Sequence, residues 1–326
     1  MSAFEFGVGL FPTEPLQKMI HLAKLSEELG FSHVWIGDSH LIWREAYVNM
    51  AAVALNTLKV KIGTGVTNPL TRHRSVVASA YATLEEYSPG RMIVGIGLGD
   101  SSVETMGMKP AKLSYFEKTM QQMRELLAGK EVPLETGKIH LLHPCKGKVP
   151  IYIAASGPKM LELSGRIADG IIVLVGVADE YIVHAKEKIA TGAKAAGRKL
   201  EDINLVLWVP CAVSDTAPAK DAVKAHVARV VAHPLPYVLD PNEQKVLEDI
   251  RKTYDYYHHM DQQADHAEVI PDWLVDKFAI AGTVAECRAQ IERVKKTGIQ
   301  QIAIIPYSPP GGSREETIRG FAKAMS

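Results

Sequence analysis

The segment Lys59-Val-Lys-Ile-Gly-Thr-Gly-Val-Thr-Asn-Pro-Leu-Thr-Arg-His73 joins an apolar strand to a polar turn. Its strand carries Val60 and Ile62, followed by Gly63 and Gly65, where a missing side chain lets a ligand or another backbone approach closely. A tight β-to-α turn would by itself account for the glycine, asparagine and proline. Because loops of this kind on rigid scaffolds often carry function, the segment also predicts a site at the strand's end.

The alternation of an apolar strand with an amphipathic helix continues outward from this segment over nearly the whole chain, as in parallel βα units. The expected strands are residues 4–11, 33–36, 60–65, 92–96, 150–154, 170–175, 204–213 and 301–305. The expected helices are residues 16–29, 47–57, 75–87, 115–127, 158–168, 178–196, 283–297 and 314–325. Eight strands and eight helices in one chain predict a closed (β/α)8 TIM barrel.

An open doubly wound sheet is the alternative architecture, but it calls for a Gly-x-Gly-x-x-Gly loop after the first strand. The sequence there is Leu10-Phe-Pro-Thr-Glu-Pro15, which lacks that pattern. A chain of 326 residues, 47% of them hydrophobic, suits one barrel, so we expect a single domain over residues 1–326. Longer segments interrupt the alternation of strands and helices after the fourth and seventh strands, at residues 129–148 and 216–276. We expect both of these excursions near the barrel mouth. Within the second, the aromatic- and histidine-rich residues 254–260 predict a lid, one wall of a substrate pocket, or an amphipathic helix on the outside of the barrel.

Charge and cysteine content narrow the class of partner. Lys plus Arg and Asp plus Glu balance at 37 each, which disfavours nucleic acid and anionic membranes and favours a small-molecule partner. Cys145, Cys211 and Cys287 form no Cys-x-x-Cys pair and leave an odd one over, which indicates a reducing compartment. There is no signal-peptide pattern, and no apolar run approaches the ~18 residues of a membrane span. We therefore expect a cytoplasmic protein with no membrane or nucleic-acid partner.

Polar residues just past the strands of a barrel converge on its C-terminal face. After the second strand, Asp38 and His40 are candidates for a general acid or base, although Asp38 also suits a helix N-cap. Trp43 offers a flat apolar face, suited either to stacking on a ligand's ring or to packing in the core. Asp100 follows a glycine pair after the fourth strand and is a further candidate acid.

The turn after the fifth strand reads Ala155-Ser156-Gly157-Pro158-Lys159. Small residues, a proline in the first helical turn and free backbone N–H groups predict an anion site at a helix N-terminus, although an ordinary turn has the same composition. No metal site is predicted, since His258 and His259 are adjacent and no His-x-x-x-His or matching carboxylates are present. Nucleophile-elbow, Walker and dithiol motifs are absent too, which favours a bound cofactor that carries the chemistry.

Several motifs in order along the chain resemble the bacterial-luciferase-like superfamily of flavin- and deazaflavin-dependent oxidoreductases, and within it the group of methylenetetrahydromethanopterin reductase. The motifs that carry the resemblance are Glu28-Leu-Gly-Phe-Ser-His-Val-Trp-Ile36, Gly63-Thr-Gly-Val-Thr-Asn-Pro69, Ala82-Thr-Leu-Glu-Glu86, Gly95-Ile-Gly-Leu-Gly-Asp100, Ile153-Ala-Ala-Ser-Gly-Pro-Lys-Met-Leu161 and Phe278-Ala-Ile-Ala-Gly-Thr283. The resemblance implies a barrel, usually a homodimer, that holds FMN or the 5-deazaflavin coenzyme F420 across its mouth.

The resemblance also implies roles for single residues. In the deazaflavin group a non-proline cis peptide at the end of the third strand supports the cofactor ring from behind, and that position is Gly65–Val66 here. Asn68 would contact the cofactor, and Asp100 would match a carboxylate proposed as a proton donor. The residues that would hold the cofactor's phosphate are Ala155, Ser156, Gly157, Pro158 and Lys159. Related dehydrogenases and reductases have His directly after the Asp of the second strand, whereas this chain has Ser39 there, which would fill that space, and His40 one position later.

Three functions stay open at this stage. The first is F420-dependent hydride transfer to or from a small organic substrate, and the second is an FMN-dependent monooxygenase that uses reduced flavin and O2 and must exclude water. The third is a non-catalytic flavin-binding barrel, which the polar strand ends disfavour. A basic groove beyond the phosphate site would favour F420, whose side chain carries carboxylates; Arg72, Arg74 and Lys159 suit such a groove without being diagnostic.

Overall fold

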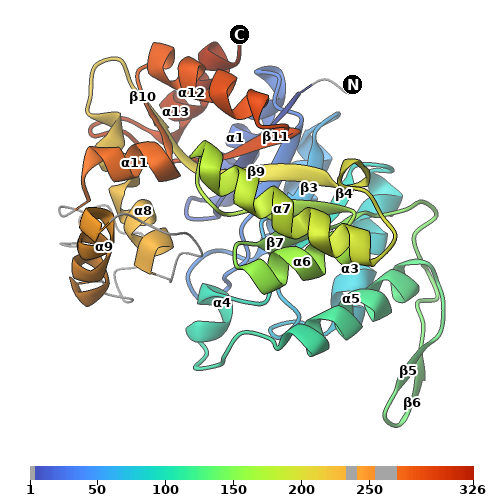
Figure 1. Ribbon diagram of the computed structural model, residues 1–326. Coiled ribbons are helices and arrows are strands. Elements are labelled where there is room, and N and C mark those ends of the chain that lie inside the picture. Colours follow the sequence, from blue (N-terminus) through green and yellow to red (C-terminus); the bar gives the residue numbers. More distant parts are fainter. Residues whose placement is uncertain (1–3, 233–240, 254–269) are drawn as a thin grey trace.

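A closed parallel barrel forms the centre of the molecule (Figure 1). The computed structural model describes residues 4–232, 241–253 and 270–326. The barrel strands are β1 (Glu5–Leu10), β2 (His33–Ile36), β3 (Lys61–Thr64), β4 (Met92–Ile96), β7 (Ile151–Ala155), β8 (Gly170–Val173), β9 (Asn204–Val213) and β11 (Gln301–Pro306). They pair in that order, and β11 pairs back to β1, which confirms the predicted (β/α)8 barrel.

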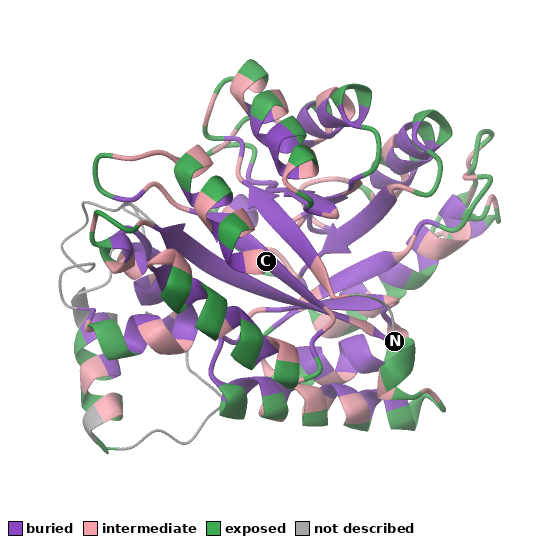
Figure 2. Ribbon diagram, turned by 90° about the horizontal axis from the view of Figure 1, so that it is seen from above, coloured by how far each residue is buried: buried purple, intermediate pink, exposed green. Residues whose placement is uncertain are grey.

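Helices surround this barrel, and Figure 2 shows that their exposed residues face outward while the strands are buried. Those that follow the barrel strands are α1 (Leu16–Glu28), α2 (Ala46–Asn56), α3 (Arg74–Tyr87), α5 (Leu113–Leu127), α6 (Pro158–Ile167), α7 (Asp179–Ala195), α12 (Val284–Lys296) and α13 (Arg314–Met325). Their bounds lie within two residues of those predicted. The predicted cap of α12 is also present, because the side chains of Thr283 and Glu286 form a reciprocal capping box.

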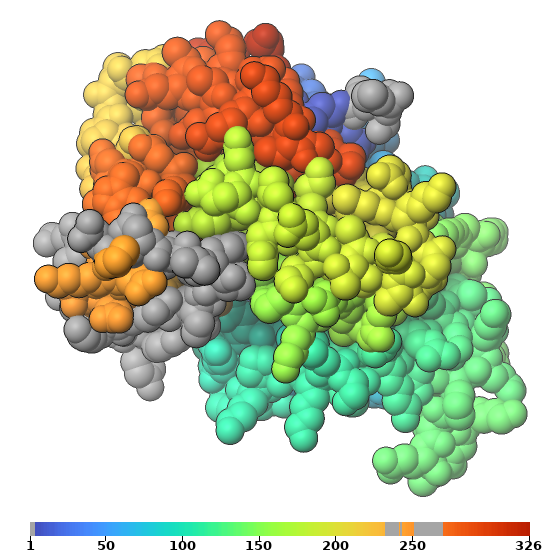
Figure 3. Space-filling view, in the orientation of Figure 1, coloured from blue at the N-terminus to red at the C-terminus, as the bar shows by residue number. Residues whose placement is uncertain are grey.

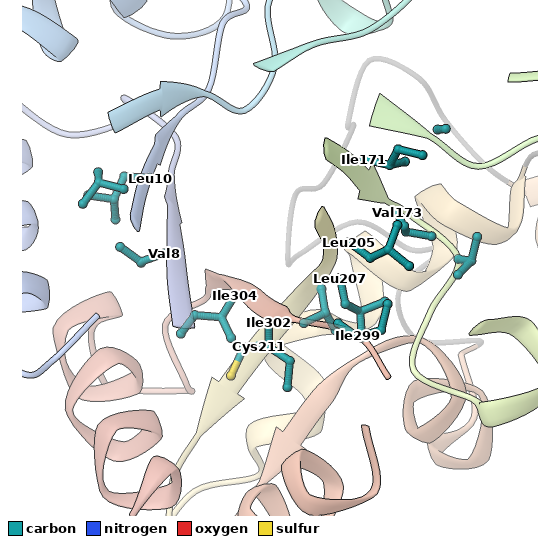
Figure 4. Close-up of a cluster of buried hydrophobic side chains, with 14 of the residues drawn as sticks. Val8, Leu10, Ile171, Val173, Leu205, Leu207, Cys211, Ile299, Ile302 and Ile304 are labelled. Atoms are coloured by element: carbon teal, nitrogen blue, oxygen red, sulfur yellow. The ribbon is translucent and has the colours of Figure 1, made fainter. Parts of the chain in front are cut away.

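The core has an outer and an inner layer. The outer layer lies between strands and helices, where β-branched and leucine side chains such as Val8, Ile304 and Leu207 pack (Figure 4). The inner layer fills the barrel itself and contains two tryptophans, Trp35 and Trp208. A barrel interior packed in this way is a solid core, so a ligand has to bind at one end of it.

The two glycines near the end of β3 make room for these tryptophans. A Cβ atom at Gly63 would lie 2.7 Å from the Trp35 ring, and one at Gly65 would lie 2.7 Å from the Trp208 ring. The sequence suggested that this space serves a ligand or another backbone. Side chains from β2 and β9 occupy this space, and another backbone approaches at Gly63 as expected, because a Cβ there would also lie 2.8 Å from the carbonyl oxygen of Ile93 in β4.

The excursion at residues 129–148 contains a hairpin of β5 (Val132–Leu134) and β6 (Gly137–Ile139). It follows α5 and precedes β7, so it lies at the N-terminal end of the barrel strands and not at the mouth, where it was expected. Figure 3 shows it projecting at the lower right, across the molecule from α9 (Pro241–Thr253).

The excursion after β9 contains the short η2 (Ala219–Val223), then α8 (Lys224–Ala232), α9 and α11 (Asp272–Phe278). Residues 254–260, predicted to form a lid, a pocket wall or an outer helix, lie outside the described residues. The strand β10 (Ile280–Gly282) was not predicted: it pairs in parallel with the end of β9, and three residues are too few to show an alternating pattern.

Candidate functional site

A cavity of about 750 Å³ opens at the C-terminal ends of the barrel strands. The loops after β2, β3, β4 and β7 all reach it, as the barrel prediction required. The predicted site residues that line it are Asp38, Ser39, Trp43, Gly65, Val66, Asn68, Asp100, Ala155, Ser156, Gly157, Pro158 and Lys159. A volume in this range suits a cofactor-sized ligand.

His40 is the exception among the predicted site residues. It is exposed and does not line the cavity, whereas its neighbour Ser39 is buried there. The Ser39 hydroxyl lies 2.7 Å from the Ser101 hydroxyl and so joins the loop after β2 to the loop after β4. The structure therefore disfavours His40 as a general acid or base.

Asp38 lies at the cavity wall, but both of its carboxylate oxygens are engaged. Arg72 Nη1 donates to Oδ1 at 2.9 Å and to Oδ2 at 2.6 Å, and Thr67 Oγ1 donates to Oδ2 at 2.7 Å. Arg72 also pairs with Glu45 and lies 4.7 Å from the centre of the Tyr47 ring. Burial opposes the charged guanidinium, yet the Asp38 and Glu45 carboxylates outweigh it and raise the pKa of Arg72. Asp38 therefore anchors the loop after β3 and is poorly placed to exchange protons.

The side-chain amide of Asn68 is also engaged, mostly by hydrogen bonds within its own loop. Its Oδ1 accepts hydrogen bonds from the backbone N–H groups of Leu70 and Thr71, both at 2.9 Å. Its Nδ2 donates to the hydroxyl groups of Thr71 and Ser102 at 3.0 and 2.9 Å. The first pair forms an asparagine turn, and the bond to Ser102 ties this loop to α4 (Ser101–Glu104). Asn68 thus shapes the cavity wall from a buried position.

The peptide bond between Gly65 and Val66 is cis, as the resemblance implied. The bond leads from β3 into the cavity wall, where the half-buried side chain of Val66 is found. Thr67 then bridges to Ile96 of β4, with hydrogen bonds from Thr67 N to Gly95 O and from Gly97 N to Thr67 O, both 2.9 Å.

The N-terminus of α6 forms another part of the wall. Gly157 is its N-cap and Pro158 its first residue, and no side chain caps the helix. Ser156 and Lys159 are exposed at this turn. Unpaired N–H groups and the positive end of the helix dipole make such a terminus suitable for a phosphate.

Asp100 lies at the mouth of the cavity, directly before α4. Its carboxylate pairs with the guanidinium of Arg229, which comes from α8 in the excursion after β9. Glu104, one turn along α4, lines the cavity too. Burial raises the pKa of Glu104, and the nearby Asp100 carboxylate adds to this.

Sequence reasoning missed several residues that line the cavity. Trp208 comes from β9, His226 and Arg229 from α8, and His226 Nδ1 lies 2.7 Å from the Tyr307 hydroxyl. An inward position for Trp208 follows from the alternation within β9, since Val206 also packs inside the barrel. No sequence signal marked the two α8 residues.

Other kinds of site find no support among residues 4–232, 241–253 and 270–326. No group of three or more His, Cys, Asp or Glu side chains in these ranges could hold a metal ion. Nor does any helix within them have the length and apolar character needed to cross a membrane.

Comparison with known proteins gives a consistent result. The chain matches the profile of the luciferase-like monooxygenase family over residues 1–301. It is 34% identical to a 5,10-methylenetetrahydromethanopterin reductase of Methanolobus tindarius, across 98% of this chain and 99% of that protein. An F420-dependent glucose-6-phosphate dehydrogenase of Nakamurella multipartita is 33% identical, across 63% of this chain and 64% of that protein. The structure of the coenzyme F420-dependent tetrahydromethanopterin reductase of Methanopyrus kandleri superposes with a TM-score of 0.82 at 28% identity, covering 98% of each chain.

Proposed function

The chain belongs to the luciferase-like monooxygenase family, and from this premise we propose that it is an oxidoreductase that uses coenzyme F420 to transfer a hydride to or from a small organic substrate. The observation that carries the proposal is the full-length similarity to reductases of this kind, one of them named as dependent on F420. FMN-dependent oxygenation has weaker support, since two monooxygenases whose structures superpose on this chain are 21% and 16% identical to it.

The residues of the cavity fit a deazaflavin coenzyme. The α6 N-terminus, with Ser156 and Lys159, would hold its phosphate. The Gly65–Val66 wall and the half-buried Trp43 would flank its ring; Trp43 is itself stacked on Phe11, with ring centres 4.3 Å apart. When bound, the coenzyme supplies a carbon centre that gives or takes up a hydride.

The chain's own residues then position the substrate, exclude water and transfer a proton. Apolar side chains such as Val66, Leu174 and Val230 line the cavity and keep water from the reacting atoms. Asp100 is the predicted acid that lines the cavity and stays partly exposed, with a single ion pair to Arg229, whereas Asp38 is buried with both carboxylate oxygens bound. We therefore assign proton transfer to the Asp100 carboxylate. Asp38 has the structural role of anchoring the loop after β3.

Titration of the purified protein with F420 and with FMN tests the cofactor. We expect F420 to bind with micromolar affinity and FMN at least about tenfold more weakly, measured by cofactor fluorescence. Tighter binding of FMN than of F420 would overturn the proposal. The first substrate to assay is 5,10-methylenetetrahydromethanopterin, because the relative that shares 34% identity acts on it.

Replacing Gly65 with alanine is expected to weaken F420 binding by about tenfold to a hundredfold. The new Cβ would lie 2.7 Å from the Trp208 ring and 3.0 Å from Trp35 Cβ, so the cavity floor or the Val66 wall must move, at the cost typical of overpacking. The matched control is Gly137→Ala on the β5–β6 hairpin, where a Cβ meets no atom within 4 Å. An unchanged F420 affinity in folded Gly65→Ala would refute the role of this wall.

A second copy of the chain is the proposed macromolecular partner. Large apolar side chains are exposed on α2, on α3 and in the loops beside them, which are Leu41, Ile42, Val48, Leu55, Leu58 and Val76. Apolar side chains gathered in this way on adjacent elements are characteristic of interfaces. Light scattering should give the mass of a dimer, and Val48→Asp should shift it toward the monomer.

The proposed location is the cytoplasm, in keeping with three free cysteines.

A further inference from the structure

Arg229 presents a positive charge to the cavity from a part of the chain that carries no predicted site residue. It lies on α8 and lines the cavity, with its side chain 15% exposed. Its Nη2 group donates to Oδ2 of Asp100, whose side chain is 53% exposed. The pair therefore links α8 to the start of α4 across the cavity mouth.

This ion pair uses few of the hydrogen-bond donors of the Arg229 guanidinium. An arginine has five N–H donors arranged to grip a carboxylate or a phosphate with two parallel hydrogen bonds. Asp100 accepts from Nη2 alone, and in the described part of the chain no other acceptor contacts the Arg229 guanidinium. The remaining N–H groups belong to a side chain that lines the cavity, so an anionic ligand bound there can accept hydrogen bonds from them.

Arg229 belongs to a different element from the anion site proposed for the cofactor. That site is the α6 N-terminus, which follows β7, whereas Arg229 comes from the excursion after β9. Among the described residues, the cavity thus has the α6 N-terminus and Arg229 as positive elements, and the cofactor's phosphate needs only the first. The other is available to a second anionic group, and charge-assisted hydrogen bonds to it would be strong.

We propose that Arg229 is a specificity residue that binds a carboxylate or phosphate group of the substrate, which takes the place of the Asp100 carboxylate. This rests on the proposed function in so far as F420 occupies the α6 site. The exchange breaks one ion pair and forms another of the same charge. It releases the Asp100 carboxylate from its ion pair at the cavity mouth only when an anionic substrate is present, which links substrate recognition to the acid assigned above.

Inorganic phosphate serves as the probe, added at constant ionic strength to protein saturated with F420 so that the cofactor site is filled. Binding is followed by NMR of the arginine Nε–Hε groups, which needs no turnover. We expect saturable millimolar binding to the wild type, at least about tenfold weaker binding to Arg229→Gln, and partial recovery in Arg229→Lys. The matched control is Arg166→Gln, which removes an exposed arginine that pairs with Glu117 outside the cavity.

Equal phosphate affinities of the wild type and Arg229→Gln, or no phosphate binding to the wild type, would overturn the inference. A tenfold loss of F420 affinity in Arg229→Gln would overturn it as well, because the anion would then be the cofactor's own side chain. Failure of the wild type to bind F420 would contradict the proposed function instead, and phosphate titration of the unloaded protein would still test Arg229.

Discussion

Replacing Arg72 with alanine is expected to lower the free energy of unfolding by about 3–5 kcal/mol, measured by urea denaturation. The reason is the Asp38 carboxylate, which is only 1% exposed and which Arg72 neutralises through two hydrogen bonds. Without the guanidinium a buried negative charge keeps only the Thr67 hydroxyl as its partner, and removing one member of a buried pair costs far more than the pair contributes.

Two variants separate this cause from lost packing. The double variant Arg72→Met with Asp38→Asn removes both charges and should recover at least about 2 kcal/mol of the loss. Arg166→Ala is the matched control: its ion pair with Glu117 has side chains 43% and 44% exposed, and the change should cost less than about 1 kcal/mol. If the double variant is as unstable as Arg72→Ala, the buried charge is not the cause.

The barrel was predictable because the sequence patterns that mark its strands and helices each lie within a short stretch of the chain. Strands such as β4 and β8 are short apolar runs and helices such as α5 have one apolar face, and the order of these patterns fixes the topology once parallel βα units are counted. The strand β10 was not predicted because it has only three residues and forms through its pairing with β9. Short elements of this kind are decided by tertiary contacts, which no local window contains.

The site was predictable in its location and less so in its chemistry. The rule that polar strand ends meet at the mouth correctly brought Asp38, Ser39 and Asp100 to one cavity. Which side chains of a loop line the cavity is a separate matter: Ser39 does, whereas the exposed His40 beside it does not. The partners are also set by distant residues, because Asp38 meets Arg72 of another loop and Asp100 meets Arg229 of α8.

Inside the barrel, a buried histidine gives rise to the other large expected effect. His33 Nδ1 lies 2.7 Å from Gln301 Nε2 and 2.8 Å from the Ser32 hydroxyl, while Gln301 Oε1 accepts from Trp35 Nε1. His33 Nε2 is buried and has no hydrogen-bond partner among the described residues. Burial lowers the pKa of His33 from 6.5 to about 3, and the positive charge of Lys61 contributes to the shift.

The wild type should therefore lose stability through His33 as the pH falls from about 6.5 toward 3. In this window the unfolded chain binds a proton that the folded protein does not accept, so each pH unit favours unfolding by about 1.4 kcal/mol. Between pH 7 and pH 4 the loss from this residue amounts to about 3 kcal/mol. His33→Gln cannot titrate, so the stability difference between wild type and variant should shrink by that amount, measured by urea denaturation at each pH. A constant difference, or a His33 imidazole NMR signal in the folded protein that titrates near pH 6.5, would contradict this account.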